Sequence, residues 1–306
     1  MTTAAPLTFT GYVDLPANKS KGGFDHAAVH AASGHVYVAH TANDAIDVFD
    51  PAAGRFLYSV PGLAGVAGAL VSDEDNLIFS SNRGGDTIGV FAPGPNPTVR
   101  YAEVGVRPNG LAYDHRRKLV LCANVGEPYT LSMIHLATGV RTEIVVPGRT
   151  RWSIYDPGLD RFFVNIMSPS KIVVVDPELV EVERIIDVPH AGAHGLDFDP
   201  ATNRLFCACD SGVLVALDAT SGKPLAQDKL SGVPDVVWFN ARRKQLYVAV
   251  GDPGVVDVFS TDPLRRIGTV ETERGAHTTA YAAKAQQLHV FLPETHRAAM
   301  YEIGDG

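Results

Sequence analysis

Short apolar segments of six to eight residues recur along the chain, and polar, turn-forming residues separate them. One set of segments reads HVYVAH, NLIFSS, KLVLCAN, RFFVNI, RLFCACD, QLYVAV and QLHVFL. A second set follows it: DAIDVFD, DTIGVFA, YTLSMIHL, SKIVVVD, GVLVALD, GVVDVFS and RAAMYEI. These segments are rich in β-branched and aromatic residues and are shorter than typical helices, so they predict β-strands.

The segments repeat with an almost constant period. Alignment on FDHAAVH, the segment around His26, yields seven equivalent positions: His26, Ala67, Asn109, Arg151, His194, Asp235 and His277. The steps between them are 41, 42, 42, 43, 41 and 42 residues. A β-rich repeat of this length is typical of propeller blades with four antiparallel strands each. The chain is therefore predicted to be all-β and to fold as a seven-bladed β-propeller.

The last repeat lacks a fourth strand of its own. Residues near 7–14 alternate in the way that a strand requires, so we expect them to pair beside residues near 297–303 and close the ring. No linker interrupts the period, which predicts a single domain, 1–306. The predicted blades lie near 21–62, 63–104, 105–146, 147–188, 189–230, 231–272, and 273–306 together with 7–14.

Composition limits the partners and the compartment. The 306 residues are 45% hydrophobic and 20% charged, which is enough apolar material for a large core. The net charge of −8 argues against a nucleic-acid partner, which would need a basic surface. No apolar run approaches the roughly 18 residues of a membrane span, and we see no secretory signal. Three cysteines, few and odd in number, favour a cytoplasmic location.

Strand topology gathers the seven equivalent positions at the mouth of the central channel, because each begins the innermost strand of its blade. Blades 5, 6, 7 and 1 are neighbours, so His194, Asp235, His277 and His26 form one continuous arc. Converging imidazoles in a partly dry channel are costly as cations and favour a neutral, metal-bound form. We expect the three histidines to bind one transition-metal ion: Zn, Fe, Ni, Cu or Mn. The alternative is a plugged channel in which they bond to one another and to water.

Three further ring positions are the predicted catalytic residues. Asp235 is a candidate fourth ligand, a general base toward bound water, or a partner that fixes an imidazole tautomer. Arg151 is expected to hold an anionic group of the substrate, and Asn109 to donate to a developing oxyanion. His40 and His296 lie in or beside loops of the same face and are rim candidates for the metal. Other loop residues that could shape a pocket there are Asp25, Trp152, Glu127 and Asp210.

The chain contains no GxSxG, P-loop, GxGxxG or HExxH motif, so the sequence does not indicate a serine hydrolase or a nucleotide-binding protein. The favoured function is a metal-dependent enzyme that acts on a small anionic or carbonyl-bearing molecule by Lewis-acid hydrolysis or elimination. One alternative is an Fe- or Cu-dependent oxidoreductase at the same site. Another is a non-catalytic binding or scaffold propeller, which leaves a protein partner open.

Long stretches of the blades resemble the YVTN/YncE-like seven-bladed propeller family. The resemblance rests on HVYVAHTANDAIDVFDPAAG, NLIFSSNRGGDTIGVFA and QLYVAVGDPGVVDVFSTDPLRRIGTV, and it extends over nearly the whole chain. The resemblance implies a seven-bladed propeller fold, but few catalytic residues of the family can be carried over to this sequence. Gluconolactonase-like propellers hold Ca or Zn on the axis mostly through Glu, Asn and Asp. Histidines replace that set here, so lactonase activity is only an analogy.

Overall fold

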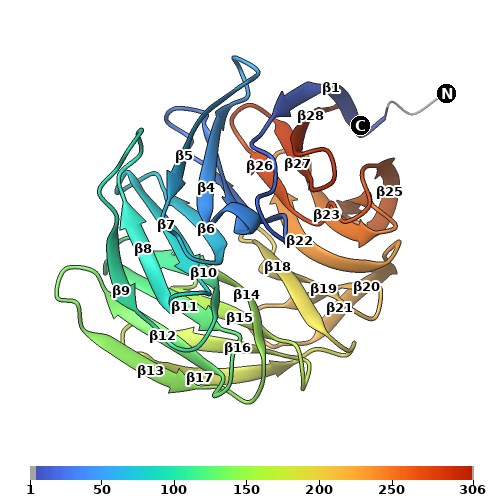
Figure 1. Ribbon diagram of the computed structural model, residues 1–306. Coiled ribbons are helices and arrows are strands. Elements are labelled where there is room, and N and C mark those ends of the chain that lie inside the picture. The colour runs from blue at the N-terminus through green and yellow to red at the C-terminus, as the bar shows by residue number, and fades with distance from the viewer. Residues whose placement is uncertain (1–4, 305–306) are drawn as a thin grey trace.

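The computed structural model describes residues 5–304, which form seven four-stranded antiparallel sheets arranged as blades around a central axis (Figure 1). The seven-bladed propeller predicted from the repeat is therefore confirmed. Residues 1–4 and 305–306, which belong to the predicted domain 1–306, lie outside the described residues. A single turn of 3-10 helix, η1 (Thr41–Asn43), is the only helix in the described part of the chain.

The strands of each blade run outward from the axis. The innermost strands are β2 (Phe24–Val29), β6 (Val66–Ser72), β10 (Pro108–Asp114), β14 (Thr150–Asp156), β18 (Ala193–Asp199), β22 (Val233–Asn240) and β26 (Thr279–Ala282). The second strands are β3 (Val36–His40), β7 (Leu77–Asn82), β11 (Leu119–Asn124), β15 (Arg161–Ile166), β19 (Arg204–Cys209), β23 (Gln245–Asp252) and β27 (Gln287–Leu292).

The outer half of each blade follows the same order. The third strands are β4 (Ala45–Asp50), β8 (Thr87–Phe91), β12 (Thr130–His135), β16 (Lys171–Asp176), β20 (Val213–Asp218), β24 (Val255–Thr261) and β28 (Arg297–Ile303). The outermost strands are β5 (Arg55–Pro61), β9 (Arg100–Glu103), β13 (Arg141–Val145), β17 (Glu181–Asp187), β21 (Pro224–Lys229), β25 (Leu264–Glu271) and β1 (Leu7–Asp14).

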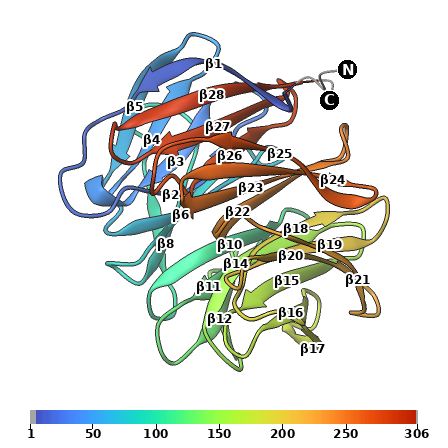
Figure 2. The same cartoon turned by 90° about the vertical axis from the view of Figure 1, so that its right-hand side faces the viewer.

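The first strand of the chain closes the ring. β1 pairs antiparallel with β28, from Leu7 opposite Ile303 to Asp14 opposite Arg297, with a register shift before Gly11 (Figure 2). The seventh sheet therefore has the order β1-β28-β27-β26. This confirms the closure predicted from the missing strand of the last repeat. Pairing both ends of the chain in one sheet covers the edge that β28 would otherwise expose.

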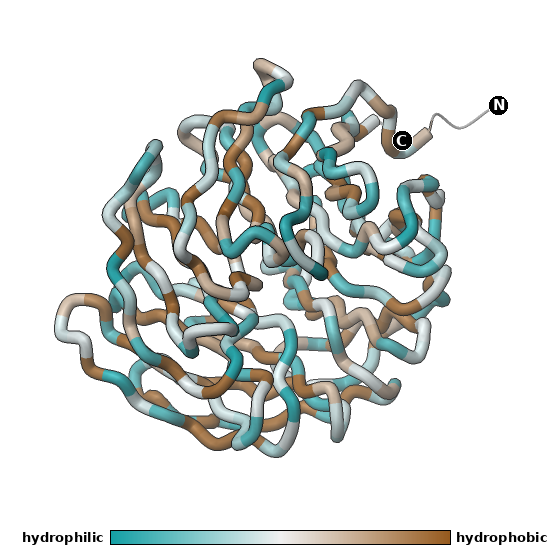
Figure 3. The backbone as a smooth tube through the Cα atoms, viewed as in Figure 1, coloured by the Kyte–Doolittle hydropathy of each residue, from teal (hydrophilic) through white to brown (hydrophobic). Residues whose placement is uncertain are grey.

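Burial decreases from the middle of a blade to its rim. Ile172 to Val175 of β16 are fully buried, whereas four of the five residues of β13 are exposed. Hydrophobic residues accordingly gather along the inner strands and hydrophilic residues along the loops (Figure 3). The core lies between blades: Phe163 of blade 4 packs in one cluster with Leu196 and Cys207 of blade 5. Burial of these apolar faces drives the blades together.

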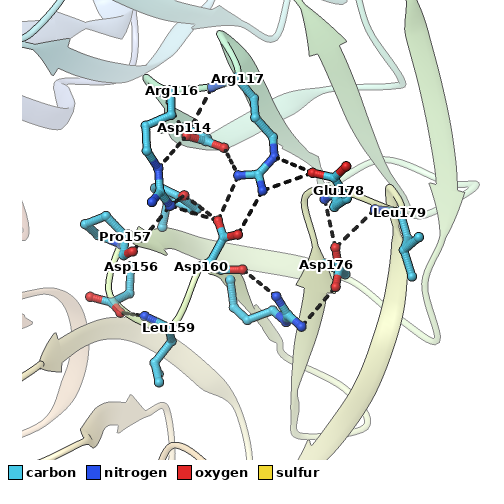
Figure 4. A network of polar contacts seen from close by, with 12 residues as sticks. Asp114, Arg116, Arg117, Asp156, Pro157, Leu159, Asp160, Asp176, Glu178 and Leu179 are labelled. Carbon is cyan, nitrogen blue, oxygen red and sulfur yellow. Dashed lines mark hydrogen bonds and ion pairs between the residues drawn. The ribbon is translucent and has the colours of Figure 1, made fainter.

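An ion-pair network joins blades 3 and 4 on the face opposite the seven ring positions (Figure 4). Arg117 donates to Asp114 at 2.8 Å, to Asp160 at 2.8 and 2.9 Å and to Glu178 at 3.2 Å. The Asp114 side chain is fully buried, so the guanidinium compensates a charge that water cannot reach. The Arg117 guanidinium is thus fully engaged by carboxylates of blades 3 and 4.

Two observations bear on the expected environment of the protein. In residues 5–304 no helix is both long and apolar enough to cross a membrane. The cysteines Cys122, Cys207 and Cys209 are free and buried. The sulfur atoms of Cys207 and Cys209 lie 4.0 Å apart and form no disulfide bond.

Candidate functional site

A break in strand pairing positions the ring residues. In six blades the register between the innermost and second strands shifts at the ring position, which lies inside the shift: His26, Ala67, Asn109, Arg151, His194 and Asp235. His277 lies two residues before β26 begins. A β-bulge bends its strand and changes the direction of a side chain, and bulges are common at the rims of barrels. The bulges explain why the mouth carries polar groups on otherwise apolar strands.

Asp235 lies between two imidazoles of the predicted arc. Its Oδ1 is 3.3 Å from Nε2 of His194, and its Oδ2 is 3.9 Å from Nε2 of His277. The second nitrogen of each ring is also hydrogen-bonded. Nδ1 of His194 is 2.7 Å from Oδ1 of Asp210, and Nδ1 of His277 is 2.8 Å from the Gly275 carbonyl oxygen. The two Nδ1 partners orient both rings so that each Nε2 faces the same carboxylate.

The charges of the mouth residues shift one another's pKa values. Burial lowers the pKa of His194, but the carboxylates of Asp235 and Asp210 outweigh burial and raise it to about 9. Burial raises the pKa of Asp235, and the charges of His194, His277 and His26 reverse this and hold it well below its usual range. The two carboxylates therefore favour the protonated form of the His194 imidazole at neutral pH.

His26 belongs to the same electrostatic group but points elsewhere. Its Nε2 is 3.5 Å from Oδ1 of Asp25, and its ring packs against Trp152 with the centroids 4.3 Å apart. Burial lowers the pKa of His26, and the nearby Asp25 and Asp235 only partly compensate. Side chains of blade 1 and blade 4 are thus in contact at the channel mouth.

The arrangement meets part of what a metal ion requires. Two ligands held at about 2.0–2.2 Å in tetrahedral geometry lie about 3.3–3.6 Å apart. The His194–Asp235 separation of 3.3 Å matches this spacing, and the His277–Asp235 separation of 3.9 Å slightly exceeds it. Within residues 5–304, however, no group of three or more His, Cys, Asp or Glu side chains is arranged to hold a metal ion. His26, whose Nε2 lies 3.5 Å from Oδ1 of Asp25, is not placed as a third imidazole ligand.

The other side of the mouth is rich in arginine. Arg83 binds Asp25 at 3.0 Å and donates to Oδ1 of Asn109 at 2.6 Å, which leaves the amide Nδ2 of Asn109 as the group that could donate to a substrate. Among the described residues, the Arg151 guanidinium donates one hydrogen bond, to the sulfur of Met167 at 3.2 Å, and forms no ion pair. Burial and the neighbouring Arg149 lower the pKa of Arg151. A desolvated guanidinium without a carboxylate partner in the described chain is suited to bind an anion.

The two rim candidates, His40 and His296, form no hydrogen bond or ion pair with Asp235 or the three ring histidines in the described residues. His40 is fully buried, with Nδ1 at 2.6 Å from Asp47 and Nε2 at 2.8 Å from Asn18. Its two nitrogens are thus engaged by β4 of blade 1 and by the segment between β1 and β2. His296 lies at the turn into β28, where its carbonyl accepts a hydrogen bond from Leu15. No contact between His296 and the ring residues is present in the described structure.

Loops after the second strands provide partners for two ring residues. Asp210 was named from the sequence only as a loop residue that could shape a pocket, and Arg83 was not named. Arg83 and Asp210 occupy equivalent loop positions, because the backbone N–H of each donates to the carbonyl two residues before a ring position. The same 41- to 43-residue step that relates the ring residues therefore also relates these loop residues. Applying the period to the loops would have identified Arg83 as the equivalent of Asp210. Arg149 was also missed, although it lies two residues before Arg151.

The central channel contains a cavity of about 360 Å³ below the mouth. It extends from His26 to Glu74 and His115, which lie on the opposite face. Asp197 of β18 lies on its wall, where it accepts hydrogen bonds from the backbone N–H groups of Phe239 at 2.6 Å and Phe198 at 2.8 Å. Burial outweighs these bonds and raises the pKa of Asp197 to about 7.

The raised pKa of Asp197 predicts a dependence of stability on pH. The folded protein binds this proton more tightly than the unfolded chain, so ionisation destabilises the fold progressively above about pH 4. Relative to Asp197→Asn, the wild type should lose about 1–3 kcal/mol between pH 5 and pH 8. Urea unfolding of both proteins at each pH measures the difference. The exposed Asp262, changed to Asn, is the control, and a difference independent of pH would contradict the assignment.

Comparisons with known proteins extend to the fold only. No protein-family model and no curated protein sequence matches the chain. A chain in the crystal structure of the mitotic checkpoint complex is 9% identical, with a TM-score of 0.82, 97% of this chain covered and 92% of that one. A chain of Kuenenia stuttgartiensis hydrazine synthase is 12% identical, with a TM-score of 0.82 and coverage of 95% and 98%. At these identities the similarity shows the β-propeller fold alone.

Proposed function

We propose that the protein is a metal-dependent hydrolase or lyase whose centre is formed by His26, His194, His277 and Asp235 at the channel mouth. The observation that carries this proposal is the direction of the imidazoles: Nε2 of His194 and of His277 both face Asp235. Each Nδ1 is held by Asp210 or by a backbone carbonyl. Such outer partners are typical of metal-binding histidines, because they fix the tautomer and the ring orientation.

The surrounding residues support an anionic or carbonyl-bearing substrate. Arg151 has no carboxylate partner in the described chain and would bind a carboxylate of the substrate. Asn109, oriented by Arg83, would donate its Nδ2 hydrogen to an oxygen on which negative charge develops. Asp235 would accept a proton or coordinate directly. A transition metal bound there would supply Lewis-acid polarisation of a carbonyl group or of a water molecule.

Family and location are proposals of the same kind. The blade motifs favour membership of the YVTN/YncE-like propellers, within the seven-bladed fold described above. Free, buried cysteines are compatible with a cytoplasmic protein. A small-molecule substrate, without nucleic acid or membrane, is the expected partner.

Metal analysis of protein purified without a histidine tag tests the proposed function. The expected result is one transition-metal ion per chain, retained through gel filtration. Zn, Ni or Mn would support hydrolysis or elimination, whereas Fe or Cu would favour the oxidoreductase alternative. Protein that contains no metal, and takes up none of these ions in solution, would overturn the metal centre and favour the scaffold alternative.

A further inference from the structure

One layer of the channel wall contains a single acid among apolar residues. Each innermost strand contributes one residue to this layer, opposite the same position of its second strand. The seven residues are Ala28, Leu70, Ala112, Ile154, Asp197, Trp238 and Ala280. An ionisable group on an apolar wall costs free energy of folding, which indicates a role other than packing.

No lysine or arginine of the cavity lining balances Asp197. The cavity lining contains neither Lys nor Arg, and its histidines, His26 and His115, lie toward the two ends. Both oxygens of Asp197 accept backbone N–H groups, which fix the carboxylate and leave further lone pairs for a ligand. Glu74, on the opposite face, adds a second negative group to the lining. The electrostatics of the channel therefore favour a cation.

Two aromatic side chains line the same cavity as this carboxylate. Trp152 and Trp238 both line the cavity, with ring centroids 6.1 Å apart and nearly perpendicular planes. Trp238 is held in place because its Nε1 donates to the Thr279 carbonyl at 3.1 Å. Indole faces attract cations, and more strongly where water is excluded.

We propose that the channel cavity binds a small organic cation, a protonated amine, through Asp197 and the two tryptophans. The cavity volume of about 360 Å³ suits such a molecule. The proposal does not depend on the metal centre. Asp197 lies three residues beyond His194, roughly 10 Å further along the strand, so the two sites can be tested separately.

The two tryptophans make the test direct, because the chain contains no others. Benzylammonium is titrated into the protein at about pH 8, above the pKa of about 7 to which burial raises Asp197, so that the carboxylate is ionised. Tryptophan emission is recorded, and benzyl alcohol serves as the neutral counterpart. We expect saturable binding of the amine, at least about tenfold tighter than that of the alcohol, because only the amine gains the ion pair and the cation–π contact. This comparison needs no variant, so it does not depend on how a substitution folds.

Variants then assign the effect to the carboxylate. Asp197→Asn should weaken amine binding about tenfold or more and leave alcohol binding unchanged, whereas Asp197→Glu should retain a preference for the amine. Asp262→Asn removes the same charge at an exposed position outside the cavity lining and should behave as the wild type. Equal affinity for amine and alcohol, no binding of either, or an unaffected Asp197→Asn variant would overturn the proposal.

Discussion

Replacing His194 with alanine is expected to lower the affinity for Zn²⁺ by more than about 100-fold, because loss of an outer partner alone costs about 10–100-fold. The variant should remain folded, since the buried strands between blades, and not the mouth, carry the apolar core. Competition with a chromophoric chelator measures the affinity, and far-UV circular dichroism confirms the fold.

A series of variants with graded losses of Zn²⁺ affinity distinguishes metal ligands from residues that only orient a ligand. His26→Ala and His277→Ala should resemble His194→Ala, whereas Asp210→Asn should cost only about 10–100-fold because Asp210 acts through Nδ1 of His194. His190→Ala is the matched control: His190 lies four residues upstream and bonds to Gln227. If all five variants bind Zn²⁺ as the wild type does, the three histidines do not form a metal centre.

The pH dependence of metal binding adds a second readout of the same centre. With its pKa at about 9, His194 carries a proton at neutral pH that a metal ion must displace. The apparent affinity for Zn²⁺ should therefore rise with pH, by about tenfold per unit, until it levels off near pH 9. In Asp210→Asn, which lacks one carboxylate beside this imidazole, the plateau should begin at a lower pH.

Asp235→Asn is expected to reduce turnover by about 10²–10⁴-fold. A chromogenic 4-nitrophenyl ester whose acyl chain ends in a carboxylate is a suitable probe of the proposed hydrolysis, with kcat and KM measured on the metal-loaded protein. If Asp235 acts as a base, the variant should retain its metal. If it coordinates, as its 3.3 Å distance from His194 favours, metal affinity should fall together with kcat.

Arg151→Ala provides the contrasting result in the same assay. We expect KM to rise for the carboxylate-bearing ester with little change in kcat, because the guanidinium binds the substrate in both ground and transition states. A neutral ester of equal chain length should be unaffected, and Zn²⁺ affinity should remain that of the wild type. Equal effects on both esters would mean that Arg151 supports the fold of the mouth instead.

The repeat is the reason that the fold could be predicted from the sequence. A constant step places each residue in the same position of its blade, so one aligned histidine locates seven ring positions. The missing fourth strand of the last repeat left one candidate, residues near 7–14, and pairing of β1 with β28 confirms it. Burial of apolar strands between blades is a local pattern that recurs seven times, and it is therefore visible in the sequence.

The period also indicated which residues share the mouth, but it could not determine where their side chains point. The direction of His26 toward Asp25 and Trp152 depends on a bulge and on a partner from a blade across the ring. The cavity was not predicted, because Asp197 and Trp238 become a common wall only when blades 5 and 6 pack together. Sequence determined the ring and its composition. Tertiary packing decided orientation, desolvation and the empty volume, because these depend on contacts between residues far apart in the chain.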